Sequence, residues 1–162
     1  MRILGIDPGL QKTGWGLIES RGNRLTFIGC GMVKTQTSLP LYARLAMLDD
    51  GLGRIIREWN PDIAAVEETF MNNNAASALK LGQARGVCMV APARMGLEVY
   101  EYAANLVKKS IVGTGHATKD QIGMMIKILL PQSGSPKEDE ADALAVAICH
   151  AHHAPAKQRI TG

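Results

Sequence analysis

The pattern of hydrophobic and polar residues predicts three strands at the start of the chain. An apolar run over residues 2–6 ends at the turn-forming residues 7–9, which indicates a buried strand that runs into a turn. Two further strands are predicted at 14–19 and 25–34, joined by a polar hairpin connection. In the third strand, alternation assigns one set of residues to a single face: Leu25, Phe27, Gly29, Gly31 and Val33. The chain therefore opens with three antiparallel strands.

A long amphipathic helix is predicted next, over residues 40–59, because large apolar residues recur at steps of three and four. Asn60-Pro61 ends it, since the residue before a proline disfavours helical geometry. A short buried strand at 63–66 follows and runs into two glutamates. Asn72, Asn73 and Asn74 then offer caps for a second helix at 75–94, whose many small side chains allow another element to approach closely.

The remaining pattern is a fifth strand at 97–100 and three helices. The first is short and reaches about residue 112. The second begins with a capping box formed by Thr118 and Gln121. The third is predicted to begin with a box of Ser135 and Glu138, with Pro136 at the first helical position, and to end near residue 150. Residues 154–162 are expected to be a flexible tail.

This order of elements predicts an α/β protein with one domain, residues 1–153. Three antiparallel strands followed by parallel crossovers give a mixed five-stranded sheet with helices on both faces. The ribonuclease-H-like fold has this order, although other α/β folds share the pattern.

Composition limits the classes of protein that the chain can represent. Its 162 residues suit one domain, and a hydrophobic share of 46% excludes wholesale disorder. No apolar run approaches the ~20 residues that span a bilayer, and Asp7 interrupts the first run too early for a signal peptide. We therefore expect a cytoplasmic protein without a membrane partner. Three widely spaced cysteines indicate reduced thiols rather than a disulfide framework or a zinc site.

Four carboxylates occupy positions that suit catalysis. Asp7 ends the first predicted strand, and Glu67 ends the fourth. Asp139 and Asp142 are three residues apart at the start of the last helix, so they share one face. A right-handed crossover would make the first and fourth strands neighbours. Each acid also has an ordinary structural explanation, as a turn residue or a partner of the helix dipole, and alternation alone does not choose between Glu67 and Glu68.

A divalent metal ion is the partner that such a cluster of acids requires. Carboxylates brought together without a cation repel one another and lose hydration. Ligands that are all oxygen favour Mg²⁺ or Mn²⁺ over zinc. Four carboxylates can hold two ions about 3.5–4 Å apart, an arrangement that promotes attack of water on a phosphodiester and departure of the leaving oxygen.

Several segments together resemble the RuvC family of Holliday-junction resolvases, over about residues 2–153. The combination is highly specific, although each segment alone would be a weak signal. The segments are G-I-D-P-G-x-x-x-T-G-W-G (5–16), V-E-E-T-F-M-N-N-N (66–74), A-L-K-L-G-Q-A-R-G-V (78–87), E-Y-A with V-K (101–108) and D-E-A-D-A-L-A-V-A-I (139–148).

The resemblance implies a ribonuclease-H-like homodimer that makes paired nicks in opposite strands of a four-way DNA junction. It implies Mg²⁺ dependence, with Mn²⁺ as a substitute, and cooperation with a branch-migration helicase complex. The residues that match the family's catalytic and metal-binding acids are Asp7, Glu67, Asp139 and Asp142, and this match selects Glu67 over Glu68.

The charge balance favours a phosphate-rich partner. With the four acids set aside, 11 acidic residues face 18 basic ones, an effective charge of +7. By resemblance, Lys108 and Lys119 are DNA-binding residues, whereas without it they would count as ordinary surface lysines. The resemblance also favours Phe70 as a side chain that stacks on an unpaired base. Arg85 either contacts phosphate or pairs with an acid.

The remaining alternatives concern the end of the chain and the function class. The cluster of His150, His152 and His153 is interpreted as a frayed helix end rather than a metal site. A sugar-kinase-like or actin-like phosphotransferase also begins with a strand, an Asp and a glycine-rich hairpin, but it needs a second similar domain. A non-catalytic junction-binding module is disfavoured by the paired Asp139 and Asp142, because acids that face phosphate weaken binding.

Overall fold

A computed structural model describes residues 1–68 and 74–158 of the chain, in which five strands form one mixed sheet. The strand order is β3-β2-β1-β4-β5. The antiparallel pairs are β1–β2 and β2–β3, and the parallel pairs are β1–β4 and β4–β5. The predicted mixed sheet is therefore confirmed. The strands are β1 (Arg2–Asp7), β2 (Lys12–Arg21), β3 (Arg24–Lys34), β4 (Ile63–Glu68) and β5 (Glu98–Ala103).

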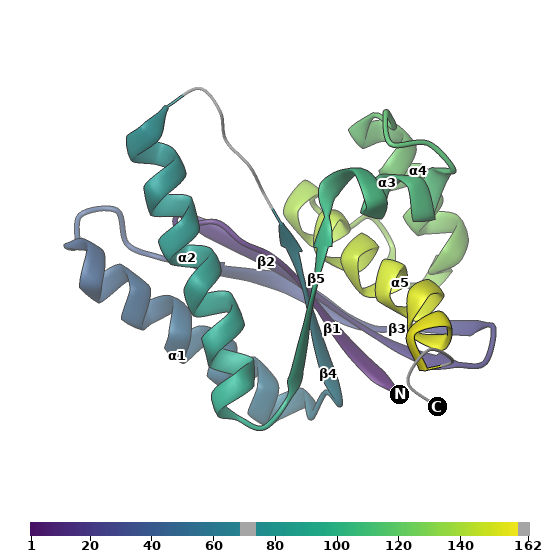
Figure 1. Cartoon of the computed structure of the whole chain (residues 1–162), viewed down its shortest axis with the longest axis horizontal. Helices are drawn as coiled ribbons and strands as arrows, with labels where there is room; N and C mark the ends of the chain where they lie inside the picture. Colours follow the sequence, from purple (N-terminus) through teal and green to yellow (C-terminus); the bar gives the residue numbers. More distant parts are fainter. Residues whose placement is uncertain (69–73, 159–162) are drawn as a thin grey trace.

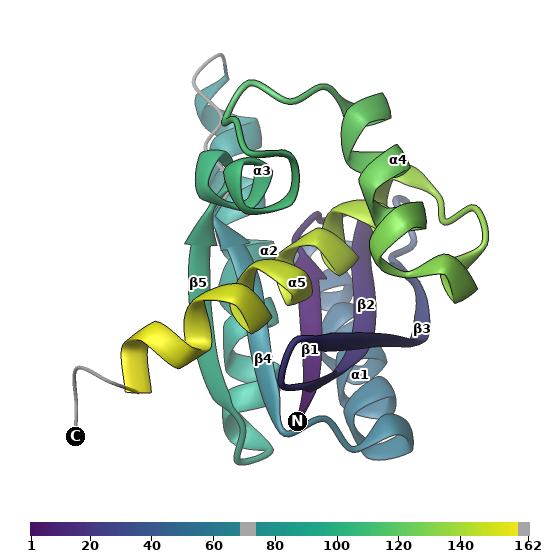
Figure 2. The same ribbon diagram turned by 90° about the vertical axis from the view of Figure 1, so that its right-hand side faces the viewer.

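Helices cover both faces of this sheet (Figure 1). Two helices lie on one face and three on the other. The last helix, α5, runs obliquely across the second face (Figure 2). A short 3₁₀ turn, η1 (Pro131–Ser133), precedes the last helix. The helices are α1 (Leu41–Trp59) and α2 (Ala75–Arg94) on the first face, and α3 (Ala104–Val112), α4 (Lys119–Leu129) and α5 (Glu138–Gln158) on the second.

Side-chain caps mark the starts of α2 and α4. Asn74 caps α2, because its side chain accepts hydrogen bonds from the backbone N–H groups of Ala76 and Ser77. The capping box of Thr118 and Gln121 is present at the start of α4. Both caps confirm the predictions from the sequence.

The start of α5 differs from the prediction. The helix begins at Glu138, and the side chain of Glu140 accepts a hydrogen bond of 2.7 Å from the backbone N–H of Lys137. The predicted box of Ser135 and Glu138 is therefore wrong, because Glu140 caps the helix two residues further along. Glu138 is left free to make a side-chain contact with another helix.

The far end of α5 also departs from the prediction, since the helix continues to Gln158 instead of ending near residue 150. His150 is buried, and its Nδ1 atom lies 2.8 Å from the hydroxyl of Tyr102. His153 Nδ1 lies 2.8 Å from the backbone oxygen of Cys149. These side chains belong to a folded helix rather than to a frayed end.

Two hydrophobic cores lie on opposite faces of the sheet. Strand β1 contributes Ile3 to the core beneath α3, α4 and α5, and it contributes Leu4 and Ile6 to the core beneath α1 and α2. This alternation is the expected consequence of a strand whose successive side chains point to opposite faces. Among the described residues, no helix has both the length and the apolar character needed to cross a bilayer.

A β-bulge changes which residues of β3 share a face. The pairing with β2 shifts between Leu17 and Ile18, so that Ile28 is an extra residue in β3. Leu25 and Phe27 consequently pack with the core beneath α5, whereas Val33 belongs to the core beneath α1. The prediction that all three share one face is wrong, because simple alternation does not persist through a bulge.

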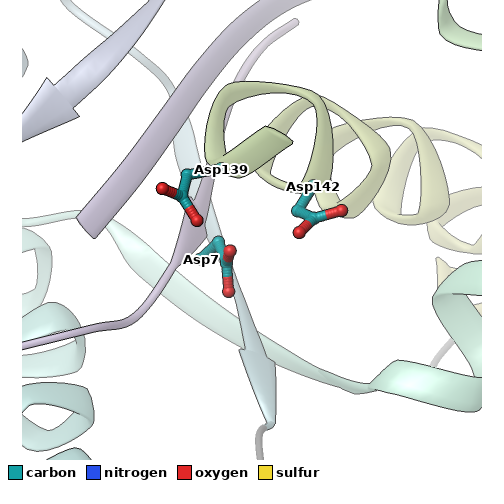
Figure 3. Close-up of side chains that lie close together, drawn as sticks. All are labelled: Asp7, Asp139 and Asp142. Carbon is teal, nitrogen blue, oxygen red and sulfur yellow. The ribbon is translucent and has the colours of Figure 1, made fainter. Parts of the chain in front are cut away.

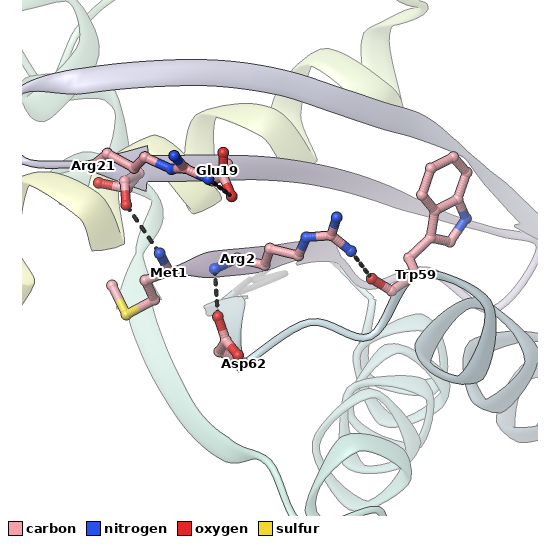
Figure 4. Close-up of polar contacts among 7 residues, drawn as sticks. Met1, Arg2, Glu19, Arg21, Trp59 and Asp62 are labelled. Carbon is pink, nitrogen blue, oxygen red and sulfur yellow. Dashed lines mark hydrogen bonds and ion pairs between the residues drawn. The ribbon is translucent and has the colours of Figure 1, made fainter.

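Polar contacts fix the beginning of β1 (Figure 4). The backbone N–H of Arg2 donates a hydrogen bond of 2.7 Å to the carboxylate of Asp62. The guanidinium of Arg2 donates one of 2.6 Å to the backbone oxygen of Trp59. These bonds join the start of β1 to the connection between α1 and β4. They help to align two parallel strands whose opposite ends carry acidic residues.

Candidate active site

The parallel pairing of β1 and β4 brings two acids together. Ile6 pairs with Val66 in the register of these strands, and Asp7 and Glu67 are the next residues along. Their carboxyl groups are close enough to share a hydrogen bond. Glu68, one residue further, pairs instead with Arg85 of α2. The sheet register thus separates the two glutamates that alternation could not tell apart.

Glycines in β1 and β2 allow α5 to lie directly on the sheet. A Cβ atom at Gly5 would lie 2.0 Å from the backbone oxygen of Ala143, and one at Gly14 would lie 2.1 Å from that of Asp139. Such distances leave no space for any side chain. The first turns of α5 are therefore held against the ends of β1 and β2, next to Asp7.

The close approach of α5 creates an acidic cluster, which we define as Asp7, Glu67, Asp139 and Asp142. Carboxylate oxygens of Asp7, Asp139 and Asp142 all lie within 4.8 Å of one another (Figure 3). Glu67 adjoins this group through its contact with Asp7 and its electrostatic interaction with Asp142. Acids from three distant parts of the sequence are thus neighbours in space.

The protonation of these acids shows that they fit a cation. Burial, together with the neighbouring charges of Glu67 and Asp139, raises the pKa of Asp7 to about 9. Burial and the charge of Asp7 raise the pKa of Asp142 to about 6, and burial also raises the pKa of Glu67. A divalent ion held by these oxygens would favour the ionised forms that the protein alone disfavours. The all-oxygen donor set suits Mg²⁺ or Mn²⁺.

A cleft beside the acidic cluster contains both lysines that the sequence singled out. It encloses about 190 Å³, and its lining includes Lys108 of α3, Lys119 of α4, Glu67 and Asp142. The positive charges of the two lysines oppose the rise in the pKa of Glu67 and of Asp142. Phe70, the third predicted DNA-binding residue, lies outside the described residues.

Arg85 of α2 lies on the face of the sheet opposite to α5 and the acidic cluster. Its guanidinium pairs with Glu68 of β4 and with Glu101 of β5, and about a quarter of its side chain is exposed (27%). Of the two roles left open by the sequence, the structure supports pairing with acids. Arg85 thereby joins α2 to the ends of two strands, one of which carries Glu67.

Sequence reasoning missed two residues that shape this site. Gly14 lies opposite Asp7 in the pairing of β1 and β2 and contacts the backbone of Asp139. A glycine inside a strand is a known signal of close backbone approach, and it could have identified this position. Glu138 pairs with Lys119 instead of capping α5; no local signal distinguishes these two roles.

The sheet order is that of the ribonuclease-H-like class, and the acidic cluster at its edge has the oxygen ligands that divalent metal ions prefer in the nucleases of this class. A family model described as crossover junction endodeoxyribonuclease RuvC matches residues 3–150. The chain therefore belongs to the RuvC family of endodeoxyribonucleases, whose members depend on divalent metal.

Curated relatives and solved structures agree with this assignment. A RuvC from Rhodopseudomonas palustris (strain BisA53) is 61% identical over 160 residues, which cover 99% of this chain and 92% of the relative. One from Afipia carboxidovorans is 59% identical over 153 residues, covering 94% of this chain and 90% of the relative. The structure of Thermus thermophilus RuvC in complex with a Holliday junction substrate superposes with a TM-score of 0.90 at 31% identity, covering 97% of this chain and 96% of that one.

Proposed function

We propose that this enzyme resolves four-way DNA junctions by paired nicks in opposite strands, and that its acidic cluster is the hydrolytic centre. One observation carries the assignment of the centre: carboxylate oxygens of Asp7, Asp139 and Asp142 lie within 4.8 Å of one another. They adjoin a cleft that two lysines line. Family membership supports the substrate, because a related RuvC has been solved with a Holliday junction.

In this proposal each group around the cleft has its own task. Asp7, Glu67, Asp139 and Asp142 hold two Mg²⁺ ions, for which Mn²⁺ substitutes. Bound metal supplies the Lewis acidity for attack of water on phosphorus and for departure of the leaving oxygen. Lys108 and Lys119 attract and orient the phosphate backbone, because ammonium groups replace the counterions of DNA. Phe70, which lies outside the described residues, is proposed from the family resemblance to stack on an unpaired base near the cut.

The proposed hydrolytic centre is tested by Asp7→Asn. We expect this variant to bind a synthetic four-way junction but to nick it at less than ~1% of the normal rate in Mg²⁺, because the cluster loses a ligand. The wild-type enzyme should nick the junction in Mg²⁺, remain inactive in EDTA, and leave linear duplex of matched sequence intact. Asp50→Asn, an exposed change on α1, is the matched control. Full activity of Asp7→Asn would remove the proposed chemistry.

We also propose a homodimer that contacts its partner subunit through α2. A four-way junction has approximate two-fold symmetry, so two equivalent sites suit two equivalent strands. Leu79 and Val90 of α2 are exposed, and a Cβ atom at Gly82 or Gly86 would meet nothing within 4 Å. An apolar, open helix face of this kind can pack closely against a second copy of itself.

The dimer proposal is tested by Val90→Arg. We expect this variant to sediment as a monomer and to lose paired nicking, since a charge would be buried in the interface. Ile128→Arg is the matched control, because Ile128 is an apolar, exposed residue of α4 on the other face of the sheet and does not line the cleft. A dimeric Val90→Arg variant with normal activity would exclude α2 as the contact.

Two further parts of the proposal rest on family membership. We propose that the enzyme works with a branch-migration helicase complex, and that it acts in the cytoplasm, where it meets recombining chromosomes. Co-purification of the tagged enzyme with a helicase on junction DNA would support the first part. Cell fractionation with detection of the nuclease in the cytoplasmic fraction would support the second.

A further inference from the structure

Lys119 forms an ion pair with Glu138 at the mouth of the cleft. Each is the first residue of its helix, α4 and α5 respectively. Their side chains are 71% and 55% exposed, so a DNA phosphate can reach the pair from solvent. Lys119 is also one of the two cationic groups whose charge acts on the acidic cluster. The carboxylate of Glu138 thus pairs with a lysine that the site would use to bind DNA.

Within the part of the chain that the structure describes, the side chain of Glu138 accepts no hydrogen bond from the start of α5. The carboxylate of Glu140 accepts the hydrogen bond at the helix start, from the backbone N–H of Lys137. Glu138 and Lys119 instead line a groove of about 430 Å³ together with Lys127 and Asp142. Lys119 and Asp142 also line the cleft of the acidic cluster, so the groove adjoins the site.

A carboxylate at this position is unfavourable for DNA binding, because it repels phosphate and neutralises a useful cation. An exposed ion pair also adds little to folding stability. A carboxylate and a phosphate, however, satisfy an ammonium group in the same way, by presenting anionic oxygens. The pair is therefore built so that one anion can replace the other.

We propose that Glu138 is an intramolecular substitute for a DNA phosphate: it holds Lys119 in the free enzyme and is displaced when the junction binds. The inference rests on the proposed DNA-binding role of Lys119. It makes Glu138 a residue that tunes affinity, because every productive complex must exchange the carboxylate for phosphate. Glu138 itself touches neither metal nor DNA in this scheme.

The test compares Glu138→Gln with Asp120→Asn in equilibrium binding to a fluorescent four-way junction in EDTA. Asp120 lines the same groove and its loss changes the net charge equally, but it is not in an ion pair among the described residues. We expect Glu138→Gln to bind about two- to fivefold more tightly than Asp120→Asn, the range that corresponds to an exposed ion pair. Glu138→Ala should give the same increase, and thermal unfolding verifies that each variant is folded.

A double-mutant cycle identifies the route of the effect. In a Lys119→Met background, Glu138→Gln should change affinity no more than Asp120→Asn does, because the lysine that it would release is absent. Equal affinities of Glu138→Gln and Asp120→Asn, or an unchanged gain without Lys119, would overturn the inference. If Lys119→Met alone binds as tightly as wild type, the proposed DNA-binding role of Lys119 fails, and this inference with it.

Discussion

Gly14 and Asp139 touch through their backbones: a Cβ atom on Gly14 would lie 2.1 Å from the backbone oxygen of Asp139. Gly14 also pairs with Asp7 across β1 and β2. Because Gly14 has no side chain, Asp139 can lie close to Asp7, although the two acids are far apart in the sequence.

Gly14→Ala should lower the nicking rate at least ~100-fold, because the start of α5 must shift and a displacement of about 1 Å is enough to disrupt catalysis. Overpacking should also cost about 1–3 kcal/mol of unfolding free energy. Single-turnover nicking and urea unfolding measure the two effects. Gly53→Ala on α1 is the control, since the nearest atoms to its Cβ atom would be at the end of the long Arg57 side chain, at 3.3 Å or more. Equal activity of both variants would contradict the role of Gly14.

In the metal-free protein, the contribution of Asp7 to stability should be lost as the pH rises from about 4 to 9. Asp7 has a pKa of about 9 in the folded protein against an ordinary value of 3.8, so between these values the folded state keeps a proton that the unfolded chain releases. The stability that Asp7 contributes is therefore fully present below the lower value and is lost as the pH rises to about 9. The wild type should lose on the order of 2 kcal/mol relative to Asp7→Asn between pH 6 and 8 in EDTA.

Mg²⁺ should remove this pH-dependent difference, because it binds the folded, ionised cluster and stabilises it by mass action. Thermal unfolding of both proteins across the pH range, with EDTA or with Mg²⁺, measures the effect. Parallel curves for the two proteins in EDTA would mean that Asp7 ionises normally.

Arg85→Met should destabilise the fold by about 1–2 kcal/mol, since it leaves Glu68 and Glu101 without their partner at the ends of β4 and β5. The nicking rate should fall, because the loss of the Arg85–Glu68 pair disturbs the end of β4, where Glu67 lies. Junction affinity should stay within about twofold of the wild type, a change well below one kcal/mol. The matched control is Arg94→Met, which removes the ion pair with Asp49 and should cost less than about 1 kcal/mol. A large loss of affinity would instead favour a direct DNA contact.

Lys108→Ala and Lys119→Ala should each weaken junction binding and reduce the slope of log affinity against log salt by about 1, as expected when one phosphate contact is lost. Lys109→Ala is the control, because this exposed neighbour of Lys108 does not line the cleft. Binding titrations at several salt concentrations give the slopes. Identical slopes for Lys108→Ala and Lys109→Ala would argue against a phosphate contact at Lys108.

Strong local signals explain why much of the fold could be predicted. The apolar run before Asp7 ends at Pro8-Gly9, and the stripe of α1 ends at Asn60-Pro61, so turn chemistry marks both boundaries. The short connection from α1 to β4 favours the parallel neighbour that the sheet contains. The approach of Asp7 to Glu67 follows from this topology.

Features that depend on distant contacts could not be predicted. The extra residue in β3 reflects its pairing with β2; the neighbouring Gly29 is a general signal of a bulge but does not identify the extra residue. At the start of α5, two capping schemes lie within a few residues, and the contact between Lys119 and Glu138 is available only in the folded protein. The burial of His150 likewise depends on Tyr102 of β5, which lies 48 residues earlier in the chain.

The dependence of the acidic cluster on α5 has a consequence during protein synthesis. A ribosome completes β1 and β4, and with them Asp7 and Glu67, long before it reaches Asp139 and Asp142. If the acidic cluster is the hydrolytic centre, as proposed above, a nascent or truncated chain that lacks the last helix carries half of the carboxylates and would be inactive. The centre would thus be complete only after α5 has been synthesised and has folded onto the sheet.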